Sequence, residues 1–217
     1  TEIYSRPDRQ NDYADDLNTR SQMINYLSGG SVYNPTDKGL GVPFEMTLAF
    51  HSDAGFSETD EWIGTLGVYT TNFNEGKLNS GISRHASRDL TDMVMTELQH
   101  DLSAKYGRQW NRRGMWNRNY SETRLPAVPS MILEILSHQN FADMRMGHEP
   151  DFKFTVARSV YKAILKHTAT MHGTGYVVQP LPVTRFAIKE GSKHTFRLSW
   201  QGVVDPQEPS AHPRGYI

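Results

Sequence analysis

The sequence contains no cysteine among its 217 residues. This absence excludes a disulfide-stapled scaffold and a thiolate metal site, and it is compatible with any redox compartment. Any transition-metal site in this chain must therefore be built from histidine, aspartate and glutamate.

Long apolar runs and an excess of one charge are also missing. No apolar run approaches the length of a membrane span, and no signal peptide is visible at Thr1. Lysine and arginine total 23 against 24 for aspartate and glutamate, which gives a formal net charge of −1. A balanced charge gives no indication of a nucleic-acid or acidic-surface partner. We therefore expect no membrane span, no nucleic-acid partner and a monomeric chain.

Both ends of the sequence have unusual features. The first residues lack an initiator methionine and resemble the end of a strand that runs into a loop. The last residues stop within an apolar run. We expect the chain to be a piece of a longer protein.

The spacing of apolar residues predicts a series of helices and strands. Segment 108–124 has no clean periodicity and is predicted to be a long surface loop. The remaining pattern predicts helices near 11–29, 80–106, 141–146 and 151–171, and strands near 44–50, 64–70 and 129–136.

Helices that alternate with continuous apolar strands predict an α/β fold with a mainly parallel sheet flanked by helices on both faces. From Tyr176 the pattern changes, because Phe196, Leu198 and Trp200 alternate with polar residues. That alternation predicts a half-buried antiparallel strand, which belongs to a partial β-sandwich segment. We place a boundary near Val178, with an α/β domain over 1–178 and a smaller module over 179–217.

Two of the predicted strands carry a group that can do chemistry. His51 ends one strand, with Ser52 and Asp53 beside it, and ligands of parallel α/β sheets bind at such strand ends. Glu134 lies among apolar residues of the other strand, where a carboxylate is costly to desolvate unless it is paired or bound to a metal. The simpler alternatives are a loop hydrogen bond for His51 and a salt bridge to Arg124 for Glu134. Taken together, the two strands favour a site.

The two strand motifs resemble those of a known enzyme family. Segment 44–54, FEMTLAFHSDA, resembles the strand of the zinc-dependent N-acetylmuramoyl-L-alanine amidases (the amidase-3 family) that ends in a metal-binding histidine. Segment 125–140, LPAVPSMILEILSHQN, resembles the strand in which that family carries its catalytic glutamate. Further similarity to the family's order of motifs is found at Ser5, Arg6, Asp8 and Arg20.

The resemblance implies an amidase fold of the phosphorylase/hydrolase type and hydrolysis of the amide between N-acetylmuramic acid and L-alanine in peptidoglycan. It makes His51 a zinc ligand and Glu134 the general base, which takes a proton from zinc-activated water and returns it to the leaving amine. A cell-wall substrate implies a secreted, periplasmic or cell-envelope location in a bacterium. Contacts to the peptidoglycan or muropeptide substrate are predicted for Ser52, Asp53, Arg124, His138 and Asn140.

The sequence departs from the family in its metal ligands. The family takes two further ligands, a histidine and a glutamate, from a strand and helix that would precede Thr1, and a catalytic zinc normally has three protein ligands. His85, His138 and His148 are possible substitutes, although a structural or solvent-exposed role is expected for each. We therefore expect this segment to bind zinc poorly or not at all.

Two other parts of the chain have alternative interpretations. Residues 181–217 resemble the start of a fibronectin type III module, in which Trp200 and Tyr216 would be core residues. Trp110, Trp116 and Tyr120 in the predicted loop either line a glycan groove or tie that loop to the body of the domain.

Two other functions stay open. A cell-wall glycan- or peptide-binding module that has lost its metal would keep the same fold, and a His-Gly-Gly element with a glutamate upstream of Thr1 would favour the enzyme over it. Another zinc hydrolase, such as a zinc carboxypeptidase or a polysaccharide deacetylase, is less consistent with the sequence. The chain lacks the His-x-x-Glu pair of the first, and it lacks the combination of an Asp-Asp pair with a His-x-x-x-His element that is typical of the second.

Overall fold

The computed structural model describes residues 11–216 and divides the chain into two compact units. The first unit ends at His167 and the second begins at Thr168. The domain boundary near Val178 stays a prediction. Ser5, Arg6 and Asp8, which contribute to the family resemblance, lie outside the described residues.

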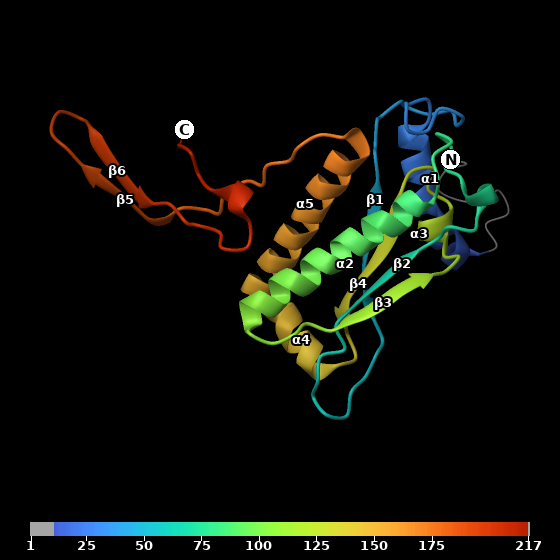
Figure 1. The fold of residues 1–217 in the computed structure, drawn as a ribbon, viewed down its shortest axis with the longest axis horizontal. Coiled ribbons are helices and arrows are strands. Elements are labelled where there is room, and N and C mark those ends of the chain that lie inside the picture. Colours follow the sequence, from blue (N-terminus) through green and yellow to red (C-terminus); the bar gives the residue numbers. More distant parts are fainter. Residues whose placement is uncertain (1–10, 217) are drawn as a thin grey trace. The chain divides into compact units, whose positions relative to one another are not determined.

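A mixed sheet forms the centre of the first unit (Figure 1). Its strands are β1 (Thr47–Asp53), β2 (Thr65–Tyr69), β3 (Arg112–Asn117) and β4 (Ser130–Ser137). Their order across the sheet is β1-β4-β2-β3, so β1 forms an edge. β1 runs parallel to β4 and β2 runs parallel to β3, whereas β2 and β4 are antiparallel. The prediction of an α/β fold with mostly parallel strands is confirmed, with an antiparallel pairing at the centre of the sheet.

Helices flank this sheet. The described residues contain α1 (Asp12–Ser28), α2 (His85–Tyr106), α3 (Ser121–Arg124), α4 (Phe141–His148) and α5 (Pro150–His172), with 3-10 turns at Asn74–Gly76 and Pro209–Ala211. Asn11 caps α1, since its side chain accepts a hydrogen bond of 2.9 Å from the backbone N–H of Ala14. Gly107 ends α2 in a left-handed conformation with φ of 61°. None of the helices in this described part is long and apolar enough to cross a membrane.

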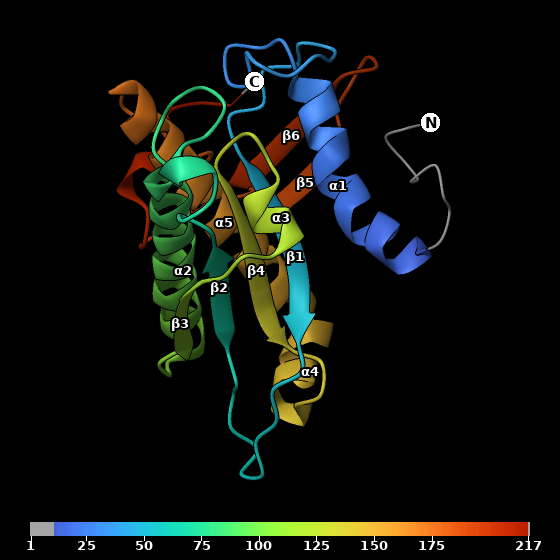
Figure 2. The same cartoon turned by 90° about the vertical axis from the view of Figure 1, so that its right-hand side faces the viewer.

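α2 and α5 pack on one face of the sheet and form the main core with it (Figures 1 and 2). Gly67 of β2 faces α2, and a Cβ at this position would lie 2.5 Å from Cγ2 of Thr91, so the strand approaches the helix closely. The core consists of buried apolar side chains: Leu90, Val94, Leu98 and Leu102 of α2, Met131 and Leu133 of β4, and Phe152, Val156, Val160 and Ala163 of α5.

The opposite face of the sheet carries a smaller apolar cluster and Glu134. Leu66 and Val68 of β2 and Ile132 of β4 form this cluster, and α3 packs over the same strands (Figure 2). Side chains alternate along a strand, so Glu134 lies on the face of Ile132 and away from the main core. The apolar strand predicted around Glu134 is thus present, and the carboxylate of Glu134 lies on the face of the sheet that α3 covers.

The predicted surface loop over 108–124 is wrong, because the segment contains β3 and α3. β3 is an edge strand with little apolar patterning, which explains why its sequence gave no strand signal. Trp110 ties the segment to the body of the unit: it is fully buried, and its Nε1–H donates a hydrogen bond of 2.8 Å to Oγ1 of Thr65. Trp116 and Tyr120 are 45% and 52% exposed.

The second unit contains an antiparallel hairpin of β5 (Thr184–Glu190) and β6 (Phe196–Gln201). The prediction of a half-buried strand here is wrong, since every residue of β6 is exposed. In the part of this unit that the structure describes, β6 pairs with β5 alone. Trp200 and Tyr216, predicted as core residues, are 40% and 48% exposed and contact each other with ring centroids 5.3 Å apart. A fibronectin type III module stays a prediction.

Asp143 of α4 ties the end of β4 to the loop between β1 and β2. Its carboxylate is completely buried and accepts hydrogen bonds from the backbone N–H groups of Ser137 at 2.8 Å, Ile63 at 2.9 Å and Gly64 at 3.2 Å. Nδ2 of Asn140 donates a further bond of 3.2 Å. Hydrogen bonds to an ionised carboxylate are stronger than neutral ones, so Asp143 fixes the end of the sheet at which Asp53 lies.

We expect Asp143→Asn to lower the free energy of unfolding by about 2–3 kcal/mol, because an amide nitrogen would then face buried N–H donors. Urea denaturation of the whole chain measures this loss. Asp151→Asn is the matched control, since the Asp151 side chain is 81% exposed, and it should change stability by less than about 0.5 kcal/mol. Equal losses in the two variants would contradict the role given to Asp143.

Candidate active site

His51 and Glu134 stand opposite each other on neighbouring parallel strands. They are register partners in the pairing of β1 with β4, so their side chains lie on the same face of the sheet. The sequence places His51 at the end of its strand, but β1 continues to Asp53 because its pairing with β4 extends to Ser137. The register shifts between His51 and Asp53, which marks an irregularity directly after the histidine.

Glu134 has a partly desolvated carboxylate. Its Oε2 atom is buried and has no hydrogen-bond partner among the described residues. Burial is the largest cause that raises the pKa of Glu134, and the negative charges of Asp53 and Glu122 act in the same direction. The charges of His51 and Arg113 oppose the rise in pKa. A carboxyl group with a raised pKa is suited to accept a proton and return it during a reaction.

Glu122 of α3 reaches over the sheet to His51. Its Oε2 atom lies 2.9 Å from Nε2 of His51, and its Oε1 atom lies 3.3 Å from Nη1 of Arg20 in α1. Arg20 also pairs with Asp16 at 2.8 Å. The Glu122 side chain is 11% exposed, compared with 31% for His51 and 47% for Arg20. A line of alternating charges therefore runs from α1 to the edge strand of the sheet.

Asp53 forms the second ion pair of the site, with Arg113 of β3. Burial acts to raise the pKa of Asp53, but the hydrogen bond from Arg113 and the backbone N–H of Ala54 outweigh it. Together with the charges of Arg113 and His138, these bonds hold the pKa of Asp53 below its ordinary value. Glu134 thus lies between a carboxylate held ionised by Arg113 and one paired with His51.

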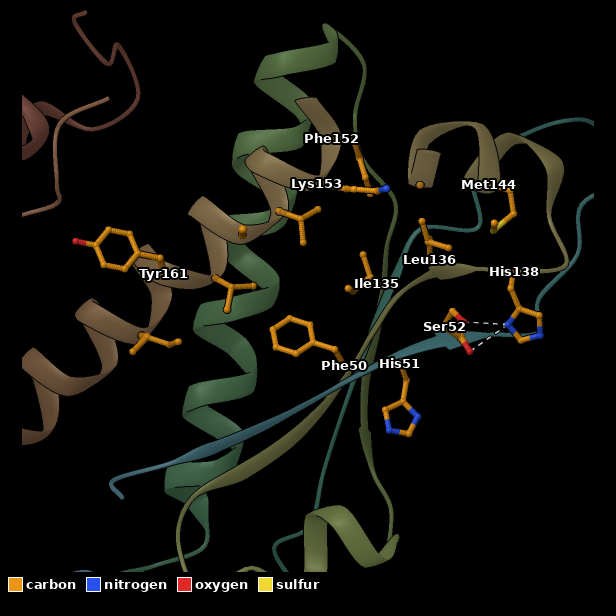
Figure 3. Close-up of a pocket in the computed structure, with 15 residues that line it drawn as sticks. Phe50, His51, Ser52, Ile135, Leu136, His138, Met144, Phe152, Lys153 and Tyr161 are labelled. Carbon is orange, nitrogen blue, oxygen red and sulfur yellow. Dashed lines mark hydrogen bonds between the residues drawn. The ribbon is translucent and has the colours of Figure 1, made fainter. Parts of the chain in front are cut away.

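Ser52 and His138 lie together, while the ring of His51 points away from them (Figure 3). Nδ1 of His138 is 3.1 Å from Oγ of Ser52 and 3.2 Å from its carbonyl oxygen. The tautomer of His138 decides which contact is a hydrogen bond, since Nδ1 either donates to the carbonyl oxygen or accepts from the hydroxyl of Ser52. Both residues are exposed and open to a ligand.

Arg124 and Asn140, which the sequence also assigns to substrate binding, have other partners. The guanidinium of Arg124 lies 5.7 Å from the ring centroid of Phe73. Asn140 is buried, and its Nδ2 donates to the carbonyl of Glu61 at 2.9 Å while its Oδ1 accepts from the N–H of Ser57 at 3.3 Å. Within the described residues, the salt bridge from Arg124 to Glu134 is not formed.

The sequence does not single out Glu122 or Arg113 as site residues. Both come from the segment predicted to be a loop, where a four-residue helix and an edge strand leave no periodic pattern. The sequence links Arg20 to the site only through its similarity to the family's order of motifs. The sequence gives only an indirect indication of Arg113. Asp53 and Glu134 are both acidic and lie on strands of the predicted site, and a cation nearby would offset the cost of burying them.

The described residues do not complete a zinc site. A catalytic zinc takes three protein ligands, and no group of three or more ligating His, Asp or Glu side chains occurs in the part of the chain that the structure describes. His51 has a carboxylate beside Nε2, while His138 faces Ser52. The residues at hand therefore do not fit a zinc ion, and no catalytic step is assigned to one.

Two hollows adjoin the pair of strands. An apolar one of about 600 Å³ is lined by α5 together with Phe50 and Ile135 (Figure 3). A more open and more polar one of about 660 Å³ is lined by Arg20, His51 and Glu122. A ligand in the polar hollow would therefore contact the charged groups of the site.

No protein-family model and no curated protein match the sequence. Solved structures do match the fold. An N-acetylmuramoyl-L-alanine amidase from Clostridium difficile 630 aligns with a TM-score of 0.50 at 12% identity, over 71% of this chain and 66% of its own. The CwlD amidase from Clostridioides difficile, in complex with the GerS lipoprotein, aligns with a TM-score of 0.51 at 14% identity, over 77% of this chain and 70% of its own. The chain therefore has the fold of these amidases and spans slightly less than two thirds of the length of the first.

We expect Glu134→Gln to stabilise the chain relative to the parent at neutral pH, and this gain should vanish as the pH falls below the ordinary glutamate value of 4.5. A raised folded-state pKa means that ionisation of Glu134 costs stability once the pH exceeds it, while below the unfolded value both states are protonated. Urea denaturation over a pH series with a chelator present measures the difference. The exposed Glu58→Gln is the control for the amide substitution. A parent–variant difference that is constant with pH would contradict the raised pKa.

Proposed function

We propose that this chain acts in the hydrolysis of the amide bond between N-acetylmuramic acid and L-alanine of bacterial peptidoglycan. The observation that carries the proposal is the pairing of His51 with Glu134 on adjacent parallel strands of an amidase fold. Both solved structures with this fold that are described above are amidases by name. A cell-envelope or extracellular location follows from the substrate.

Glu134 is the proton carrier of the proposed reaction. An amide is cleaved when water adds to its carbonyl carbon and the nitrogen leaves with a proton, so one group must take a proton from the water and give one to the amine. Burial already raises the pKa of Glu134, and its buried Oε2 atom has no hydrogen-bond partner among the described residues. The same carboxyl can therefore serve first as the base and then as the acid.

Substrate contacts are proposed where polar or aromatic side chains are open to solvent. Ser52 and His138 are exposed next to each other near the end of β1. Trp116 and Tyr120 are about half exposed and offer aromatic faces for a sugar ring. Asn140 is buried, so we assign it to the fold and not to the substrate.

Zinc enters the proposal only through His51. When bound in such a site, zinc supplies an activated water and polarises the carbonyl. His51 is the candidate ligand that the sequence motif gives, and the described residues leave the rest of a three-ligand set unfilled.

We expect Glu134→Ala to lower cleavage of a purified muropeptide by about 10²- to 10⁴-fold, which is the usual contribution of a general acid–base group. Mass spectrometry of the separated glycan and peptide products measures the turnover, and circular dichroism checks that the variant is folded. Glu58→Ala, on the surface, should keep the parent rate. Turnover that survives in a folded Glu134→Ala variant would refute the proton-carrier role.

His51→Ala should lose any zinc that the purified parent chain retains after dialysis against a zinc buffer. The reason is that the variant loses the imidazole that the proposal makes a ligand. Elemental analysis gives the metal-to-protein ratio, with the exposed His212→Ala as the matched histidine control. Equal zinc ratios above zero in parent and His51→Ala would exclude His51 as a ligand, whereas a parent without zinc would agree with the incomplete ligand set.

A non-catalytic module that binds cell-wall glycan or peptide is the second candidate. It is favoured by the incomplete ligand set and by the position of Glu122 beside Nε2 of His51. A parent chain that binds muropeptide but never cleaves it would support this module over the enzyme.

A further inference from the structure

Glu122 uses its two oxygens for two different partners. Oε2 lies 2.9 Å from Nε2 of His51, and Oε1 lies 3.3 Å from Nη1 of Arg20. The Glu122 side chain is more buried than either partner, with 11% of its surface exposed. Among the described residues, Nε2 of His51 faces the carboxylate of Glu122 and not that of its register partner Glu134.

The position of Glu122 is set by the backbone around it. Oγ of Ser121 donates to the carbonyl of Leu17 at 3.1 Å, and Oγ of Ser21 donates to the carbonyl of Ser121 at 3.2 Å. These bonds fasten α3 to α1, and thereby place Glu122 next to Arg20.

A second set of bonds holds the other side of α3. Oγ1 of Thr123 lies 2.7 Å from Oγ1 of Thr70, at the end of β2. The buried Arg84 donates to the carbonyl of Arg124 at 2.8 Å and to that of Thr123 at 3.4 Å. α3 is therefore held from two sides. These hydrogen bonds fix the position of Glu122 independently of its contacts with Arg20 and His51.

We propose that Glu122 is a positioning residue that fixes the tautomer of His51, with the proton on Nε2 and the free lone pair on Nδ1. A neutral imidazole carries its proton on one nitrogen and a lone pair on the other. A lone pair on Nε2 would repel the carboxylate oxygen 2.9 Å away, whereas an N–H there is attracted to it. Arg20 balances the charge of Glu122, so the carboxylate can stay ionised beside a neutral ring.

The fixed tautomer decides which nitrogen can do chemistry. Nδ1 is then the ring atom that can take a proton or donate its lone pair to an electrophile, and Nε2 can do neither. This use of Nδ1 rests on the proposed function, while the tautomer belongs to the unliganded chain. The two claims therefore fail separately.

The test is a long-range ¹H–¹⁵N correlation spectrum of the ¹⁵N-labelled full chain. It is recorded with a chelator in alkaline buffer, in which an ordinary imidazole is neutral. Peaks of His51 are assigned as those missing from His51→Gln. We expect Nδ1 to resonate as the unprotonated nitrogen and Nε2 as the protonated one, with an excess of this form of about tenfold or more.

Variants of Glu122 test the cause. Glu122→Ala should shift His51 toward a mixture of both tautomers. In Glu122→Gln the single amide oxygen faces the guanidinium of Arg20, which can only donate, so the amide NH2 faces Nε2 of His51 and should favour the opposite, Nδ1–H form. Glu58→Ala is the control and should leave the spectrum unchanged. A protonated Nδ1 in the parent, or an unchanged tautomer ratio in a folded Glu122→Ala, would overturn the proposal. Once the His51 peaks are assigned, the parent spectrum decides the tautomer whatever the muropeptide assay gives.

Discussion

The parallel pairing of β1 with β4 is the constraint on which the rest of the site depends. It sets His51 opposite Glu134, and because strands have a period of two, a shift by one residue would turn Glu134 toward the main core. That core is packed with apolar side chains of α2 and α5, among which an unpaired carboxylate would be costly to desolvate. The register therefore decides both the stability of the sheet and the face on which chemistry can occur.

The carboxyl of Glu134 lies between two pairs of polar side chains. One pair joins Asp53 to Arg113, and the other joins His51 to Glu122. Each carboxylate of these pairs has an arginine beside it, Arg113 for Asp53 and Arg20 for Glu122, while Oε2 of Glu134 is buried and has no hydrogen-bond partner among the described residues. Natural proteins rarely keep such an atom without a use, since an unsatisfied buried acceptor costs free energy. The free-energy cost of burying a charge in this site therefore falls mainly on the carboxyl of Glu134.

The sequence predicted those features that have a strong local signal. Continuous apolar residues located β4, and the cost of a carboxylate among them drew attention to Glu134. Helical spacing located α2 and α5. Glu122 and Arg113 could not be found in this way, because their places depend on tertiary contacts such as Ser21 with Ser121 and not on periodicity. For the same reason the alternation in β6 predicted a buried face that the hairpin does not have.

β1 is an edge strand, and this has a consequence for handling and assembly of the protein. In the part of the chain that the structure describes, its outer row of backbone N–H and C=O groups has no ladder partner, and such a row is a template for another strand. A strand that docked there would place its side chains directly beside His51, on the side opposite β4. This edge and His51 thus share one strip of backbone, so a strand that paired with β1 would also limit access to the proposed site.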